Sequence, residues 1–152
     1  MPDILYFPLA GRYLPNPQSI YAQFEGTPPN PCRKYHVSSD LNGAERVAGL
    51  VLPFLANRGI MHKVVKTRRE LERQTNGAQA GKFITIYMSN TVDQLNPVIV
   101  QLGSQLAELS RRGLARPCPT VPKSRRFQHI FIEQPLDRAM FIYGGYECDP
   151  YE

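Results

Sequence analysis

The chain has 152 residues, of which 42% are hydrophobic and 20% charged, and this composition suits one globular domain with its own core. No run of about 18 apolar residues is present, and the N-terminus lacks a basic segment followed by an apolar one, so we expect a cytoplasmic protein without a membrane span. The formal net charge of +5 suits an anionic partner, either a phosphorylated peptide or a nucleic acid.

The first 32 residues are rich in proline and aromatic side chains, from Phe7-Pro8-Leu9 to Pro28-Pro29-Asn30-Pro31. Prolines at this density exclude a long helix, and a flexible linker would hold fewer aromatic residues. We predict an extended arm, residues 1–32, that its aromatic side chains hold against the rest of the domain. One short helix is expected near Ser19–Phe24.

The rest of the chain alternates between strand and helix patterns. Arg33–Ser38 is typical of a strand, and Asp40 is suited to cap a helix over Leu41–Asn57, in which Pro53 predicts a kink or a break. The remaining expected elements are strands over Ile60–Lys66 and Lys82–Tyr87, helices over Thr67–Gln74 and Asp93–Arg112, closing strands over Gln128–Glu133 and Arg138–Tyr143, and a turn at Gly144-Gly145. This order predicts one compact α+β domain, residues 1–152, with a mixed or antiparallel sheet flanked by helices.

Common nucleotide and hydrolase motifs are absent from the sequence: it contains no GxGxxG, no GxxxxGK[ST] and no GxSxG. Its three histidines lack metal-ligand spacing, so no metal site is predicted. Cys32, Cys118 and Cys148 are widely separated and odd in number, which argues against a zinc site or a disulfide framework. We expect reduced thiols.

Polar side chains gather on the predicted strands instead. Lys34 and His36 project from one face of their strand, because side chains alternate along a strand. On the next strand His62 and Lys63 lie on opposite faces, and Tyr87 ends the third strand. A lysine, a histidine and a tyrosine on adjacent strands can line one pocket, but a lysine-rich strand face is more often solvated and a lone histidine more often structural.

Four motifs occur in order along the chain: Lys34-Tyr35-His36-Val37-Ser38, Gly59-Ile60-Met61-His62-Lys63-Val64, Gly81-Lys82-Phe83-Ile84-Thr85-Ile86-Tyr87 and Tyr143-Gly144-Gly145-Tyr146. With these motifs the sequence resembles the N-terminal lyase domain of class III and class IV lanthionine synthetases, which is related to phosphothreonine lyase effectors of type III secretion. The third motif is nearly identical to the family's GKFITIY segment. The resemblance spans almost the whole chain and implies a phosphothreonine-lyase-like fold.

The resemblance implies β-elimination of phosphate from a phosphorylated peptide or protein, without a metal or an organic cofactor. Phosphoserine would become dehydroalanine, and phosphothreonine would become dehydrobutyrine. Such a reaction needs a base for the α-proton, an acid for the leaving phosphate, and cations to stabilise developing negative charge. A lysine can act as the base only when its pKa is lowered, and a histidine suits the acid near neutral pH.

The matching positions receive their roles from the family. Lys63 would be the general base and His36 the general acid. Lys34 would lower the pKa of Lys63 and stabilise the enolate, and Tyr87 would position the base.

The phosphate-binding residues match the family less well than the acid–base residues. The relatives use arginines for phosphate, but the loop Thr75–Ala80 has none, and Ile142 stands where another arginine usually lies. We expect Arg125, Arg126 and Arg73 to bind phosphate in their place, with Arg68 or Arg69 as alternatives to Arg73. A solvated basic loop is the alternative explanation for Lys123–Arg126.

The expected setting is the biosynthesis of a lanthipeptide-type peptide, with a separate kinase that supplies the phosphorylated substrate. One alternative is a secreted effector lyase that acts on a host kinase. A second is a degenerate lyase fold that binds a leader peptide or a phosphopeptide without turnover. A nucleic-acid binder is disfavoured, because aromatic residues are not interleaved with lysine and arginine on one strand face.

Overall fold

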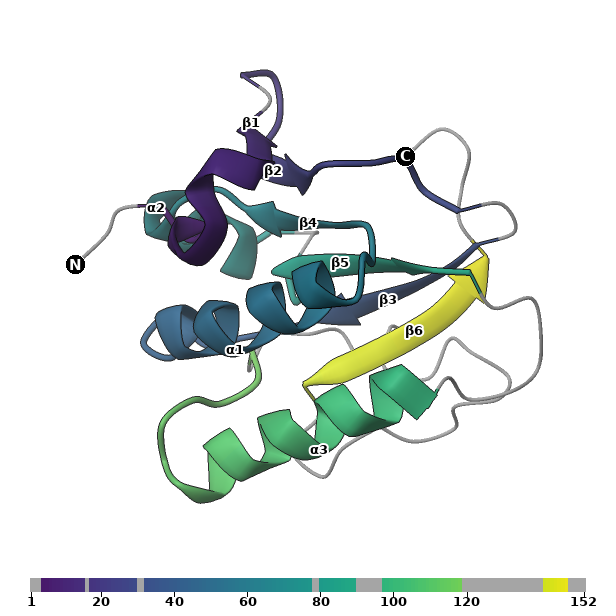
Figure 1. Ribbon diagram of the computed structural model, residues 1–152. Helices are drawn as coiled ribbons and strands as arrows, with labels where there is room; N and C mark the ends of the chain where they lie inside the picture. The colour runs from purple at the N-terminus through teal and green to yellow at the C-terminus, as the bar shows by residue number, and fades with distance from the viewer. Residues whose placement is uncertain are drawn as a thin grey trace.

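The computed structural model describes residues 4–15, 17–29, 32–77, 80–89, 97–118 and 141–147. Their strands form one six-stranded sheet in the order β1-β2-β4-β5-β3-β6, and every neighbouring pair is antiparallel (Figure 1). The elements are η1 (Phe7–Arg12), β1 (Tyr13–Pro15), β2 (Tyr21–Phe24), β3 (Arg33–Val37), α1 (Ala44–Asn57), β4 (His62–Val65), α2 (Arg68–Thr75), β5 (Ile84–Met88), α3 (Pro97–Arg111) and β6 (Ile142–Glu147). The predicted compact α+β domain with an antiparallel sheet is confirmed.

The main core lies between one face of the sheet and the helices α1 and α3, which pack against each other (Figure 1). Cross-strand partners share a face of an antiparallel sheet. Tyr35 pairs with Ile86, and Val37 and Val64 each pair with Ile84, so these five side chains line the core face, where all are buried. The opposite face therefore carries the alternate residues of the same three strands.

The helix predicted over Leu41–Asn57 is confirmed from Ala44 onward. The Asp40 carboxylate accepts hydrogen bonds from the backbone N–H groups of Gly43 and Arg116, both at 3.1 Å, so it fixes the turn before α1 and its junction with the segment after α3. The predicted break at Pro53 is wrong, because α1 continues through it. Burial of the helix on the core face outweighs the lost hydrogen bond of one proline.

The short helix expected near Ser19–Phe24 is wrong. Tyr21–Phe24 forms β2, which pairs with β4 and carries β1 on its other edge, so the N-terminal segment extends the sheet. Ala22 and Phe24 are buried on the core face, which is the alternation of a strand. The helical turn lies earlier, at η1.

The turn predicted at Gly144-Gly145 is also wrong, because both glycines lie inside β6. β3 pairs Tyr35 with Gly144 but Lys34 with Tyr146, so the register shifts by one residue at this point. Gly144 has a φ of 110°, which only glycine adopts readily. The glycine pair therefore forms a bulge that keeps β6 beside β3. The strand predicted over Gln128–Glu133 lies outside the described residues.

One of the two described cysteines differs from the expectation of reduced thiols. Cys32, directly before β3, is disulfide-bonded. Cys118, in the segment after α3, is a buried free thiol that packs against Tyr143. In the described ranges, no helix is long and apolar enough to cross a membrane.

The bulge predicts that Gly144 tolerates no side chain. Gly144→Ala should lower the free energy of unfolding by about 1 kcal/mol or more, because a Cβ is strained at this φ. Gly49→Ala on α1 is the matched control: nothing lies within 4 Å of its added Cβ, so stability should rise by about 0.5–1 kcal/mol. Chemical denaturation measures both, and equal stability of the two variants would contradict the bulge.

Candidate functional site

Four residues that the sequence singled out lie on one face of β4, β5 and β3. Lys34 is the cross-strand partner of Tyr87, and Thr85 is the partner of both His36 and Lys63. Partners share a face, and so do residues two apart on one strand. Lys34, His36, Lys63 and Tyr87 therefore share the face opposite the helical core. Strand alternation predicted only that Lys34 and His36 share a face and that Lys63 lies opposite His62.

Most of these polar groups are withdrawn from solvent. Lys34 is 3% exposed and His36 2%, while Tyr87 is also buried and Lys63 is half-buried. Lysine is almost never fully buried without a compensating partner, because removing its charge from water is costly. Burial of Lys34, with the half-buried Lys63 on the same sheet face, is thus a feature of a site more than of a solvated surface.

The Lys63 amine has the electrostatic setting of a base. Burial lowers the pKa of Lys63, and the nearby Lys82 ammonium lowers that pKa further by charge repulsion. A lysine with a lowered pKa exists more often as the neutral amine that accepts a proton. Sequence reasoning assigned this cationic neighbour to Lys34 and gave Lys82 no role. Lys82 could have been suspected only from its place in the GKFITIY motif.

His36 is held by a residue that the sequence analysis missed. Its Nδ1 lies 3.2 Å from the Thr85 Oγ1, in a hydrogen bond buried between β3 and β5. The Tyr143 ring lies beside the imidazole at 5.3 Å between ring centroids. The Thr85 bond fixes the orientation of the ring. The only sequence signal for Thr85 is its position two residues before Tyr87, which puts both on one face.

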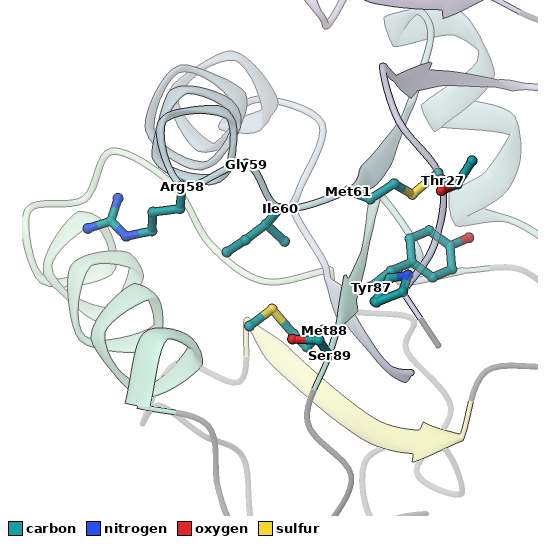
Figure 2. A pocket seen from close by; sticks show the side chains of 9 residues that line it. Thr27, Arg58, Gly59, Ile60, Met61, Tyr87, Met88 and Ser89 are labelled. Atoms are coloured by element: carbon teal, nitrogen blue, oxygen red, sulfur yellow. The ribbon is translucent and has the colours of Figure 1, made fainter. Parts of the chain in front are cut away.

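Tyr87 joins this face to a pocket. Burial raises the pKa of Tyr87 to about 12, so its phenol stays protonated and can donate a hydrogen bond near neutral pH. A cavity of about 210 Å³ opens beside it, lined also by Met61 and Thr27 (Figure 2). Figure 2 shows the Arg58 side chain on the far side of Ile60 from the Tyr87 ring.

The pocket's own arginine is engaged elsewhere. The Arg58 guanidinium stacks on the Phe54 ring at 3.7 Å from its centroid and donates a hydrogen bond to the Phe54 carbonyl at 3.0 Å. Arg58 is therefore bound to the C-terminal end of α1 and is a poor candidate for holding phosphate in this pocket.

The predicted phosphate-binding arginines are not joined to the acid–base residues by any contact that the described residues show. Arg125 and Arg126 lie outside the described residues. Arg73 is exposed on α2. Arg68, on the same helix, pairs with Glu45 of α1 at 3.5 Å and so points toward the helical side.

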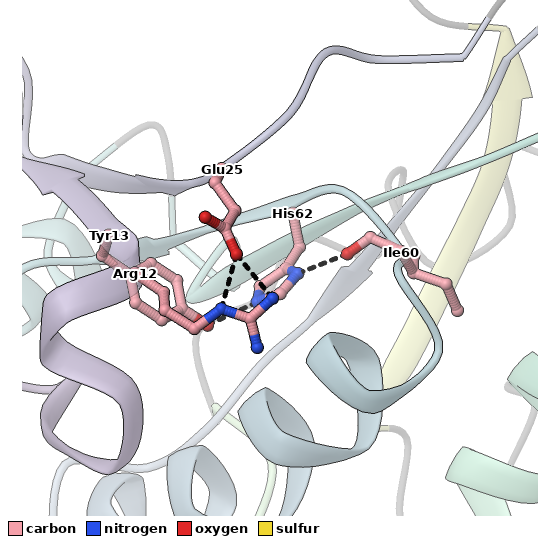
Figure 3. Close-up of polar contacts among 5 residues, drawn as sticks. All are labelled: Arg12, Tyr13, Glu25, Ile60 and His62. Carbon is pink, nitrogen blue, oxygen red and sulfur yellow. Dashed lines mark hydrogen bonds and ion pairs between the residues drawn. The ribbon is translucent and has the colours of Figure 1, made fainter.

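The second described histidine, His62, is structural. On the core face, its Nδ1–H donates to the Ile60 carbonyl at 2.7 Å, and its Nε2 accepts from the Tyr13 hydroxyl at 2.5 Å (Figure 3). The ring also stacks on Phe24, with 4.7 Å between centroids. Burial lowers the pKa of His62 to about 4, so the imidazole is neutral at neutral pH.

Metal-binding side chains do not cluster in the described parts of the chain, where no three histidine, cysteine, aspartate or glutamate residues are placed to hold an ion. A model of the family described as RamC, N-terminal domain, matches residues 21–129. This span includes Lys34, His36, Lys63 and Tyr87. No curated protein matches the chain.

The buried His62 predicts a pH dependence of stability. Its pKa is lowered from 6.5 to about 4 in the folded state, so between these values the unfolded chain binds more protons. Stability should fall as the pH falls from 6.5 toward 4, by up to about 3 kcal/mol. Denaturation at several pH values measures this slope. His62→Gln should flatten the slope, and an unchanged slope in this variant would contradict the assignment.

Proposed function

The chain belongs to the family of the RamC N-terminal domain, and we propose that it is a phosphoserine or phosphothreonine lyase that removes phosphate from a peptide by β-elimination. The observation that carries this proposal is the cross-strand row in which Lys63 and His36 lie on either side of Thr85. A half-buried lysine with a lowered pKa and a buried histidine, facing the same way, support acid–base chemistry between them.

The spacing of this row suits a substrate between the two groups. Lys63 and His36 are two strands apart, which separates their backbones by roughly 10 Å. A phosphorylated side chain bound along this row would have its α-carbon toward the lysine and its phosphate toward the histidine. The base then acts at the Cα–H bond, and the acid acts at the oxygen of the Cβ–O bond.

In the first half of the reaction, the neutral Lys63 amine takes the α-proton of the phosphorylated residue. The electron pair of the Cα–H bond moves toward the carbonyl group as an enolate. Lys34, which is buried on the same face, would stabilise the negative charge as a cation in a place of low dielectric. Tyr87, the cross-strand partner of Lys34, would donate its phenolic hydrogen bond toward the base.

In the second half, the enolate electrons form the Cα=Cβ double bond and the Cβ–O bond breaks, with its electron pair leaving on phosphate. His36 gives its proton to that phosphate. Lys63 has gained one proton and His36 has lost one, so a proton transfer through solvent restores both. No water is added to the peptide, which separates the reaction from phosphate hydrolysis.

The substrate would be a phosphorylated peptide made by a kinase, in lanthipeptide-type biosynthesis. The cavity beside Tyr87 offers room for peptide residues next to the reacting one. A degenerate fold that binds a phosphopeptide without turnover is the second candidate. It is favoured by the exposure of Arg73 and by Ile142 in the place of an arginine, which leave fewer groups to hold phosphate.

Mass spectrometry of a phosphothreonine peptide, before and after incubation with the protein, tests the proposal. We expect the peptide to lose the mass of phosphoric acid. Lys63→Ala should abolish this loss, and His36→Ala should slow it by about 10²–10⁴-fold. Lys66→Ala is the matched control, because Lys66 pairs with Glu70 at 4.0 Å, away from this face, and should keep the wild-type rate.

Each outcome of this assay separates the candidates. Binding of the phosphopeptide by the wild-type protein, without a change in peptide mass, would establish the binding module and exclude the lyase. Near-normal turnover in Lys63→Ala would show that another group takes the proton.

The Thr85 hydroxyl predicts an effect on His36. Thr85→Val keeps the side-chain shape but removes the hydrogen bond to Nδ1, so the elimination rate should fall about tenfold, the value of one ordinary hydrogen bond. The pKa of His36, followed by NMR titration, should shift in the same variant. Thr85→Ser restores the hydroxyl and should restore both values; a wild-type His36 titration in Thr85→Val would refute this role.

A further inference from the structure

An aromatic ring lies over the Lys63 amine. The Lys63 Nζ is 4.4 Å from the ring centroid of Tyr21, which belongs to the neighbouring strand β2. Tyr21 is the cross-strand partner of Val65, two residues from Lys63, so the ring lies on the same face as the amine. An ammonium group at this distance from a ring face is attracted by the ring's quadrupole.

The Tyr21 ring is itself held in place. Its hydroxyl donates a hydrogen bond to the Lys82 carbonyl at 3.1 Å. The Gln74 amide nitrogen donates to the Tyr21 hydroxyl and to the same Lys82 carbonyl, both at 3.0 Å. One side chain of α2 thus joins β2 to the segment that leads into β5.

Gln74 is an unusual residue for this role if only packing is needed. It is 5% exposed, and most other residues of the short helix α2 are charged and exposed or half-exposed. An apolar side chain would fill the same space without the cost of burying an amide. The amide is therefore explained by the hydrogen bonds that it gives, which fix Tyr21 relative to Lys82.

We propose that Tyr21 is a positioning residue for Lys63, whose amine its ring holds in one place on the polar face of the sheet, and that Gln74 holds Tyr21 in that position. The part of this inference that concerns turnover by Lys63 rests on the proposed lyase function. The contact itself is a property of the free protein. It makes β2 and α2 parts of the site, although neither carries an acid or a base of the proposed reaction.

The ring and the other neighbours of Lys63 act in opposite directions. Burial and Lys82 favour the neutral amine, whereas the Tyr21 ring favours the ammonium. Removing the ring should therefore lower the pKa of Lys63 further while releasing its side chain. A merely structural role for Tyr21 would leave the titration of Lys63 unchanged.

Two variants of Tyr21 test the proposal. In Tyr21→Leu, the pKa of Lys63, measured by NMR after ¹³C-methylation of lysines, should fall by about 0.5–1 pH unit. Tyr21→Phe keeps the ring and should stay near the wild-type value. Equal shifts in the two variants, or no shift in a folded Tyr21→Leu, would overturn the proposal. Gln74→Leu, which retains the apolar part of the contact, should change the pKa in the same direction and by less.

The pH dependence of the elimination rate is a second, independent test of the role of Tyr21. The lower limb of the pH–rate profile should move to lower pH in Tyr21→Leu, and its plateau kcat should fall about tenfold or more with KM little changed, because the amine is misplaced. If the wild-type protein eliminates phosphate but Tyr21→Leu changes neither the pH–rate profile nor the plateau kcat, the role of Tyr21 is refuted and the proposed lyase function is kept. If the wild-type protein eliminates nothing, the lyase fails, and the NMR titration still decides the role of Tyr21.

Discussion

The antiparallel pairing of β4 and β3 with the central strand β5 is the constraint on which the candidate site depends. In this register Thr85 faces Lys63 on one side and His36 on the other, and Tyr87 faces Lys34. A slip of one residue in either pairing would turn its polar side chains into the helical core and expose Val64 or Tyr35 instead. The alternate positions, apolar except for His62, therefore stabilise the register, and the register places the polar residues of the other face.

The two faces of the sheet differ in the side chains that they bury. The core face is closed by α1 and α3, and its one histidine, His62, is neutral and hydrogen-bonded at both ring nitrogens. The other face buries Lys34 and His36, which costs free energy that an apolar pair would not. Departures of this kind from the most stable choice are concentrated at functional sites.

The ionisable groups of the polar face are shifted in the directions that proton transfer near neutral pH requires. Burial and Lys82 lower the pKa of Lys63, and burial raises the pKa of Tyr87 to about 12. These shifts favour a neutral amine at Lys63 and a protonated phenol at Tyr87, one group able to accept a proton and the other to donate a hydrogen bond. The Tyr21 ring opposes the shift of Lys63, so the balance at this amine is set by residues from β2, β4 and the segment before β5.

Much of this protein followed from local patterns in the sequence. Alternation placed Lys34 with His36 and separated Lys63 from His62, and apolar periodicity located α1 and α3, because side-chain direction within one element depends only on its own backbone geometry. Only the tertiary structure decided which elements are neighbours. It placed β2 beside β4, made Gly144 a bulge where a turn was expected, set Thr85 between Lys63 and His36, and made Lys82 the cation that acts on Lys63. These are contacts between residues far apart along the chain, and their distances follow from strand register and packing, which no local pattern encodes.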